Sequence, residues 1–348
     1  MNRHAKPYVL TNENSPAFWL DGVLWMPLAT GVLTKNRFSL LEQQMHVGGG
    51  PPTHMHYQDE GFYVLEGACM FNAGGQSIRA GAGTFISIPR ETPHSFTVEG
   101  DPTRVLNFYL PAGFEMILMG VASPAPERRI PALDELPFPP SSVVEELSRE
   151  YGQVKVLGLP FVDPPDEHNK ATMPSRTNSI VPYSLQMSEA PAYWHADILW
   201  TLLASGQQTG GSYSLFEELC PKLSGPSPHT HEQDEMIYLL EGEATFLVGN
   251  QTFSARAGAF VFIPEGTVHS FRVESNTARL LNFYAPAGYE QVIGEVGLPA
   301  TTRTLPPAGL SGRADAEKIA ALLERVGMHQ IAVPDVLRSE SKTARPIG

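Results

Sequence analysis

Four residues in the first half of the chain have the types and spacing of metal ligands. His54 and His56 lie two residues apart in a strand-like run, and Glu60 keeps the same parity along it. His94 follows after a turn and a second strand-like run. Because residues i and i+2 of a strand project from one face, both imidazoles of the first pair can point to one place. Three imidazoles and a carboxylate suit a divalent first-row metal (Mn, Fe, Co, Ni, Cu or Zn), whereas Ca²⁺ prefers oxygen ligands.

The same four residue types recur 175 positions later, at His229, His231, Glu235 and His269. The repeat extends beyond these candidate ligands, since nine of the fourteen positions from His54 to Gly67 are identical in residues 229–242. Such self-similarity indicates a duplicated unit. We therefore expect two similar domains with one metal each, at residues 1–159 and 181–334, with a linker at 160–180 and a tail at 335–348.

Each copy has the pattern of an all-β domain. Short apolar or alternating runs, such as residues 85–89, 95–98 and 104–110, are separated by Gly and Pro, which favours a sandwich or barrel. One helix is predicted to close each copy. In the first copy it covers residues 142–151, with Ser142 and Glu145 at capping-box spacing and an end at Gly152; the second copy has an equivalent apolar stripe over 319–326.

Composition narrows the class of protein. The 348 residues include 24 Lys plus Arg and 37 Asp plus Glu, a net charge of −13 that argues against nucleic-acid binding. No apolar run is long enough for a membrane span, and the chain start lacks the apolar core of a secretion signal. The two cysteines, Cys69 and Cys220, cannot form a disulfide framework, so we expect a cytoplasmic protein.

The residues around the first ligand set predict an apolar cavity. Strand alternation places Phe62 and Phe96 on the ligand side, and we add Met45 and Phe85 as expected substrate-binding residues. On the strands that carry the ligands, the inward positions of both halves contain no charged residue besides the ligands themselves. A small dianion such as oxalate would need an Arg or Lys beside the metal. The lining therefore favours a small hydrophobic or aromatic substrate.

The motif His-x-His-x3-Glu-x6-Gly, followed by Gly-x5-Pro and a further His, resembles the two cupin motifs, at residues 54–67 with 83–94 and at 229–242 with 258–269. The chain is thus similar to a bicupin, with two tandem double-stranded β-helix (jelly-roll) barrels. Among bicupins it most resembles the quercetin 2,3-dioxygenase-like group. Two departures are the His-x3-Glu spacing, which oxalate decarboxylases and oxidases also have, and Val98 and Val273 where the second motif has Asn.

The resemblance implies a metal-dependent dioxygenase that cleaves a flavonol-like or other enolic or phenolic aromatic compound. Glu60 and Glu235 would act as general bases on the substrate oxygen, and dioxygen would be the second substrate. Two alternatives stay open: a non-oxygen cupin metalloenzyme, such as a decarboxylase, isomerase or lyase of a small acid, and a pirin-like metal-dependent binding protein. Because Phe62 and Met45 correspond to Ile237 and Cys220 in the second copy, we expect the N-terminal centre to be the main catalytic one. A homodimer is the expected assembly.

Overall fold

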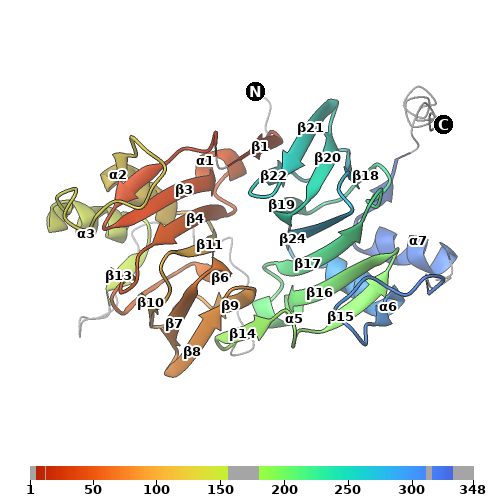
Figure 1. Cartoon of the computed structure of the whole chain (residues 1–348), viewed down its shortest axis with the longest axis horizontal. Coiled ribbons are helices and arrows are strands. Elements are labelled where there is room, and N and C mark those ends of the chain that lie inside the picture. The colour runs from red at the N-terminus through yellow and green to blue at the C-terminus, as the bar shows by residue number, and fades with distance from the viewer. Residues whose placement is uncertain (1–4, 12, 156–179, 311–315, 332–348) are drawn as a thin grey trace. The chain divides into compact units, whose positions relative to one another are not determined.

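The computed structural model describes residues 5–11, 13–155, 180–310 and 316–331. These residues form two compact units, each built on two β-sheets (Figure 1). The N-terminal unit holds the first ligand set and the C-terminal unit holds the second.

The N-terminal unit combines an eight-stranded and a five-stranded sheet. The larger sheet has the order β12 (Ser123–Pro124), β2 (Phe18–Leu20), β3 (Val23–Ala29), β4 (Ser39–Met45), β11 (Thr103–Leu110), β6 (Asp59–Glu66), β9 (Thr84–Ile88) and β14 (Tyr183–Gln186). The smaller sheet has the order β13 (Gln153–Lys155), β5 (His54–His56), β10 (His94–Val98), β7 (Ala68–Ala73) and β8 (Gln76–Gly81). Buried apolar side chains from both sheets, among them Met45, Phe62, Phe71 and Phe96, pack into one core.

The C-terminal unit repeats this arrangement. Its larger sheet has the order β1 (Tyr8–Leu10), β22 (Phe260–Ile263), β19 (Asp234–Glu241), β24 (Thr277–Ala285), β17 (Ser214–Pro221), β16 (Ile198–Ala204), β15 (Ala192–His195) and β25 (Leu298–Pro299). Its smaller sheet has the order β21 (Gln251–Arg256), β20 (Glu243–Val248), β23 (His269–Val273), β18 (His229–Thr230) and β26 (His329–Gln330). Strands β6 and β19, and β10 and β23, have bounds that differ by 175 at both ends.

The helices are short: α1 (Gly31–Thr34), α2 (Phe114–Val121), α3 (Ser141–Glu150), α5 (Gly206–Thr209), α6 (Tyr289–Val296) and α7 (Ala316–Arg325). Within the described residues two helices follow each barrel, α2 with α3 and α6 with α7, where one was predicted. Gly152 follows α3 with a positive φ of 72°, as predicted for a helix end. The capping-box prediction was wrong, because the N-cap of α3 is Pro140 and Ser142 lies inside the first turn.

The prediction of two jelly-roll domains followed by helical segments is confirmed. Each larger sheet also includes one strand from the range predicted for the other domain: β1 lies beside β22, and β14 pairs with β9. The boundaries 1–159 and 181–334 stay a prediction. The linker 160–180, apart from Ile180, and the tail 335–348 lie outside the described residues.

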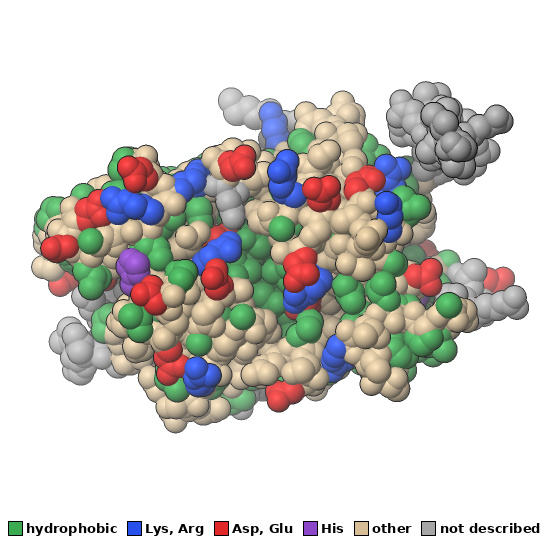
Figure 2. Space-filling view, in the orientation of Figure 1, with side chains coloured by type: hydrophobic (Ala, Val, Ile, Leu, Met, Phe, Trp, Pro, Cys, Tyr) green, Lys and Arg blue, Asp and Glu red, His purple; other side chains and the backbone are tan. Residues whose placement is uncertain are grey.

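Two surface properties bear on the classes of partner. On the face seen in Figure 2, Lys and Arg side chains lie among Asp and Glu side chains. In the described parts of the chain, no helix has both the length and the apolarity that crossing a membrane requires. The expectation that the protein does not bind nucleic acid stays a prediction.

Candidate metal centres

The two sheets of the N-terminal unit bring the first predicted ligand set together. His54 and His56 lie on β5, and the antiparallel register of β10 places His94 directly opposite His54. The candidate ligand atoms of these three histidines all lie within 4.8 Å of one another. Glu60 reaches the same place from β6 in the larger sheet. The fold thus assembles four residues that are up to 40 positions apart in the sequence.

Backbone carbonyls orient each of the three imidazoles. The Nδ1 atoms of His54, His56 and His94 lie 2.9, 3.0 and 2.7 Å from the carbonyl oxygens of Pro52, Gln58 and Thr92. Because a carbonyl oxygen only accepts, each Nδ1 carries the proton and donates it. In the neutral form of each ring the Nε2 atom is then free of a proton and suited to coordination, and the carbonyls provide the outer support that metal-binding histidines usually have.

Glu60 completes this centre with one carboxylate oxygen. Its Oε2 lies 3.3 Å from Nε2 of His56 and 2.8 Å from Nε2 of His94. The buried His94 nitrogen has no well-aligned hydrogen bond even at that short distance. A ring nitrogen that lies this close to a carboxylate oxygen without hydrogen-bond geometry fits a pair of groups directed at a common ion. These residues therefore fit a divalent metal bound by three nitrogens and one oxygen.

The pKa values of His54 and Glu60 agree with this interpretation. Burial and the neighbouring His94 lower the pKa of His54 to about 4, so its imidazole is neutral near pH 7. Burial alone would raise the pKa of Glu60, but His94 and His56 hold it well below the usual range. A neutral imidazole and an ionised carboxylate are the forms that bind metal. Burial alone would lower the pKa of His94, but the charge of Glu60 raises it, so a metal would displace a proton from this ring.

The C-terminal unit reproduces the centre with His229, His231, Glu235 and His269. The Nδ1 atoms lie 2.9, 2.8 and 2.8 Å from carbonyl oxygens of Ser227, Gln233 and Thr267. Glu235 Oε2 lies 3.3 Å from His231 Nε2 and 2.8 Å from His269 Nε2, the same distances as in the first centre. The chain therefore has two histidine-rich sites of metal-binding geometry.

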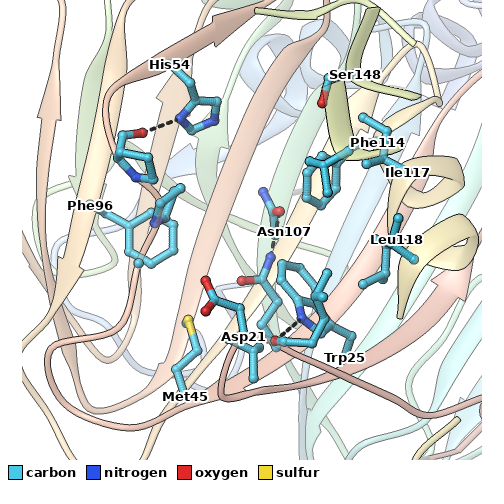
Figure 3. Close-up of a pocket in the computed structure, with 18 of the residues that line it drawn as sticks. Asp21, Trp25, Met45, His54, Phe96, Asn107, Phe114, Ile117, Leu118 and Ser148 are labelled. Carbon is cyan, nitrogen blue, oxygen red and sulfur yellow. Dashed lines mark hydrogen bonds between the residues drawn. The ribbon is translucent and has the colours of Figure 1, made fainter. Parts of the chain in front are cut away.

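A cavity of about 250 Å³ reaches the N-terminal centre. His54 and Glu60 lie on its wall, together with the predicted substrate-binding residues Met45, Phe62 and Phe96. Figure 3 shows Met45 and Phe96 on one side of this space and Trp25 and Phe114 on the other. Helix α2 contributes four lining residues (Phe114, Ile117, Leu118 and Val121), and α3 contributes two (Val144 and Ser148).

The structure corrects the assignment of Phe85. This residue is fully buried but does not line the cavity. In the pairing of β6 with β9, Phe85 lies opposite Tyr63, whereas Ile86 lies opposite the inward-facing Phe62. Since neighbouring residues of a strand point to opposite faces, Phe85 projects away from the barrel interior, where its ring stacks against Phe108.

Several cavity residues were not predicted. The cavity wall also includes Trp25, Gln43, Asn107 and Tyr109. Gln43 has the same strand parity as Met45, a signal that could have identified it. Asn107, a polar residue in the apolar run 104–110 that recurs at Asn282, was a second available signal.

The C-terminal centre contains a charge-bearing residue that the sequence analysis did not anticipate. Glu218 on β17 occupies the position of Gln43, is fully buried, and accepts a hydrogen bond of 2.9 Å from Asn282. Burial raises its pKa to about 8, and the nearby Glu235 adds to the rise. The expectation from the sequence covered only the ligand-bearing strands, so it did not include β17, nor Asp21, an acidic residue on the wall of the N-terminal cavity.

The chain is similar in sequence to known proteins. A family profile for the cupin domain matches residues 41–109 and 215–284. The chain is 24% identical over 299 residues to quercetin 2,3-dioxygenase of Bacillus subtilis (strain 168), which covers 84% of this chain and 86% of that protein.

Solved structures agree with the fold. A structure of oxalate decarboxylase from Bacillus subtilis, 14% identical, has a TM-score of 0.55 and covers 80% of this chain and 77% of that chain. The protein Ylba from E. coli, 12% identical, has a TM-score of 0.54 over 82% of this chain and 93% of that chain. With a cupin match and a histidine-rich centre in each half, the chain is a bicupin, a protein with two cupin domains.

Proposed function

We propose that this bicupin is a metal-dependent dioxygenase that cleaves a flavonol-like or other enolic or phenolic aromatic compound, mainly at its N-terminal centre. The observation that carries the proposal is the apolar cavity that ends at His54 and Glu60. Aromatic rings, a thioether and aliphatic side chains form most of its wall, and among the described residues that line it there is no Lys or Arg. Such a wall suits a planar apolar molecule that presents one ionisable oxygen to the centre.

The residues of the centre and of the cavity wall have separate roles in this proposal. His54, His56 and His94, with Glu60, would hold a divalent metal, which when bound supplies a Lewis acid that lowers the pKa of a substrate hydroxyl. Glu60 is ionised and is the carboxylate at the centre that would accept the hydroxyl proton. Phe62, Phe96 and Trp25 contact the rings and exclude water, which keeps the electron-rich substrate anion available to dioxygen.

The similarity to quercetin 2,3-dioxygenase from Bacillus subtilis supports the substrate class. The main alternative is a non-oxygen reaction on a small acid, which the His-x3-Glu spacing allows. The cavity argues against it, since no Lys or Arg side chain among the described lining residues would join the metal in the charge-assisted contacts that repay the desolvation of a small dianion. A metal-dependent binding protein would show no turnover with either kind of substrate.

An oxygen-electrode screen of the purified, metal-reconstituted protein tests the proposal. Flavonols and other enolic aromatics should consume dioxygen, oxalate should not react, and the variant His56→Ala should be inactive or strongly impaired. Turnover of oxalate without dioxygen consumption would support the decarboxylase alternative. No turnover of either substrate with any of Mn, Fe, Co, Ni, Cu or Zn would favour the binding protein.

A further inference from the structure

One buried asparagine lies beside the metal-binding glutamate in each barrel, but it has different partners in the two. Asn107 lies on β11 and Asn282 lies on β24, at positions that differ by 175. Both are buried, with exposed fractions of 0% and 2%. The metal ligands themselves are of the same types in the two centres. The different partners of the asparagine therefore change how the metal-binding glutamate is held, and not which residues bind the metal.

In the N-terminal centre, the asparagine amide holds Glu60. Gln43 Nε2 donates to Asn107 Oδ1 at 2.8 Å, and Asn107 Nδ2 donates to Glu60 Oε1 at 2.9 Å. The two bonds fix which way the amide faces, because its oxygen is occupied by Gln43 and its NH₂ group is presented to the carboxylate. Glu60 is thereby held at Oε1, and its other oxygen, Oε2, faces His56 and His94.

In the C-terminal centre, the amide is directed to a different acceptor. Glu218 stands where Gln43 does, and its carboxyl group offers an acceptor oxygen to the asparagine where Gln43 offers its donor Nε2. Asn282 Nδ2 donates to Glu218 Oε1 at 2.9 Å and to the hydroxyl of Tyr284 at 3.0 Å. Asn282 Oδ1 is buried without a hydrogen-bond partner. The glutamine-to-glutamate difference therefore turns the amide toward Glu218 and away from Glu235.

We propose that Gln43 and Asn107 are positioning residues that hold Glu60 for the N-terminal metal, and that Glu218 withdraws the equivalent support from Glu235. An N–H donated to a carboxylate stabilises its ionised form and fixes its orientation. Partners of this kind behind a metal ligand typically change metal affinity about 10-fold to 100-fold. The two centres thus differ in metal affinity through one residue that touches no metal. This inference rests on the metal centres of the proposed function.

The test uses the same substitution in both centres. In the background His231→Ala, which leaves only the N-terminal centre, Asn107→Leu should weaken Co²⁺ binding about 10-fold to 100-fold in isothermal titration. In the background His56→Ala, which leaves only the C-terminal centre, Asn282→Leu should weaken Co²⁺ binding less than about threefold, because its amide serves Glu218. Far-UV circular dichroism and thermal unfolding show whether each variant folds. If the leucine variants do not fold, Asn107→Ser and Asn282→Ser are compared in their place.

A double-mutant cycle separates positioning from packing. Glu218→Gln should free the Asn282 amide to face Glu235, so that Asn282→Leu then weakens Co²⁺ binding as much as Asn107→Leu does. A role in packing alone predicts no such change. Equal losses from Asn107→Leu and Asn282→Leu, or a cycle without coupling, would overturn this inference and leave the proposed function intact. Failure of Co²⁺ and the other first-row metals to bind either unsubstituted centre would overturn both.

Discussion

Replacing Glu218 by glutamine should change how the stability of the metal-free protein depends on pH. Burial raises the pKa of Glu218 from 4.5 to about 8, the Asn282 hydrogen bond opposes this, and Glu235 adds to it. Below pH 4.5 the carboxyl is protonated in both the folded and the unfolded chain. Between pH 4.5 and about 8 the unfolded chain releases the proton while the folded chain keeps it, so the free energy of unfolding falls as pH rises. Above about pH 8 the loss is complete.

The size of the effect follows from the pKa difference. A rise of about 3.5 pH units, at about 1.4 kcal/mol per unit, sets an upper limit of roughly 5 kcal/mol, of which a few kcal/mol is the realistic expectation. The glutamine side chain of the variant has no proton to release, so Glu218→Gln should be more stabilising at pH 8 than at pH 5. Comparing the wild type with Glu218→Gln at each pH cancels the contribution to stability of the titrating groups that both proteins share.

Urea unfolding of the metal-free wild type and of Glu218→Gln, at pH 5 and at pH 8, measures the difference. The matched variant Gln43→Glu places a carboxyl at the equivalent position of the N-terminal barrel and should lose stability over the same pH range. If the stabilities of wild type and Glu218→Gln change in parallel between pH 5 and pH 8, the argument from a buried, protonated Glu218 is refuted.

Three further predictions concern the metal centres and the cavity. Metal analysis should find about two first-row metal ions per chain and about one in His56→Ala, because the two ligand sets share no residue; loss of both ions, or a folded protein without metal, would contradict this. Glu60→Gln should retain most of its metal yet lower kcat about 100-fold or more, and Glu235→Gln should lower kcat less; an equal or reversed order in steady-state assays would refute the ranking of the centres. Phe62→Ala and Phe96→Ala should raise KM for an aromatic substrate about 2-fold to 13-fold through lost ring contacts, whereas Phe85→Leu, outside the cavity, should leave KM unchanged; a similar rise for all three would contradict the assigned lining.

The features set by local spacing could be predicted from the sequence. A duplicated pattern reveals two domains, and strand parity places His54, His56 and Glu60 on one face without any knowledge of the partner strands. The helix ends at Gly152 and Gly327 were predictable for the same reason, since a glycine with positive φ ends a helix locally.

The features set by packing between distant segments could not be predicted in this way. Helices α2 and α3 line the cavity because they pack together beside the barrel, and no residue in them carries a chemical signature. Phe85 was assigned to the cavity for its aromatic type, but its register with β6 decides the face it occupies. The roles of Gln43 and Glu218 depend on an amide 64 residues away in the sequence, and alternation on one strand does not show which way that amide is turned.

The proposed function requires that the N-terminal centre ionise an aromatic enol and expose it to dioxygen. Anaerobic addition of a flavonol to the metal-loaded protein, followed by admission of dioxygen, tests it through the visible absorption of the flavonol. We predict the spectrum of the flavonol anion under anaerobic conditions, its disappearance only after dioxygen is admitted, and neither change in His56→Ala. A flavonol that stays protonated in the presence of the loaded protein, or an anion that persists in dioxygen, would contradict the account.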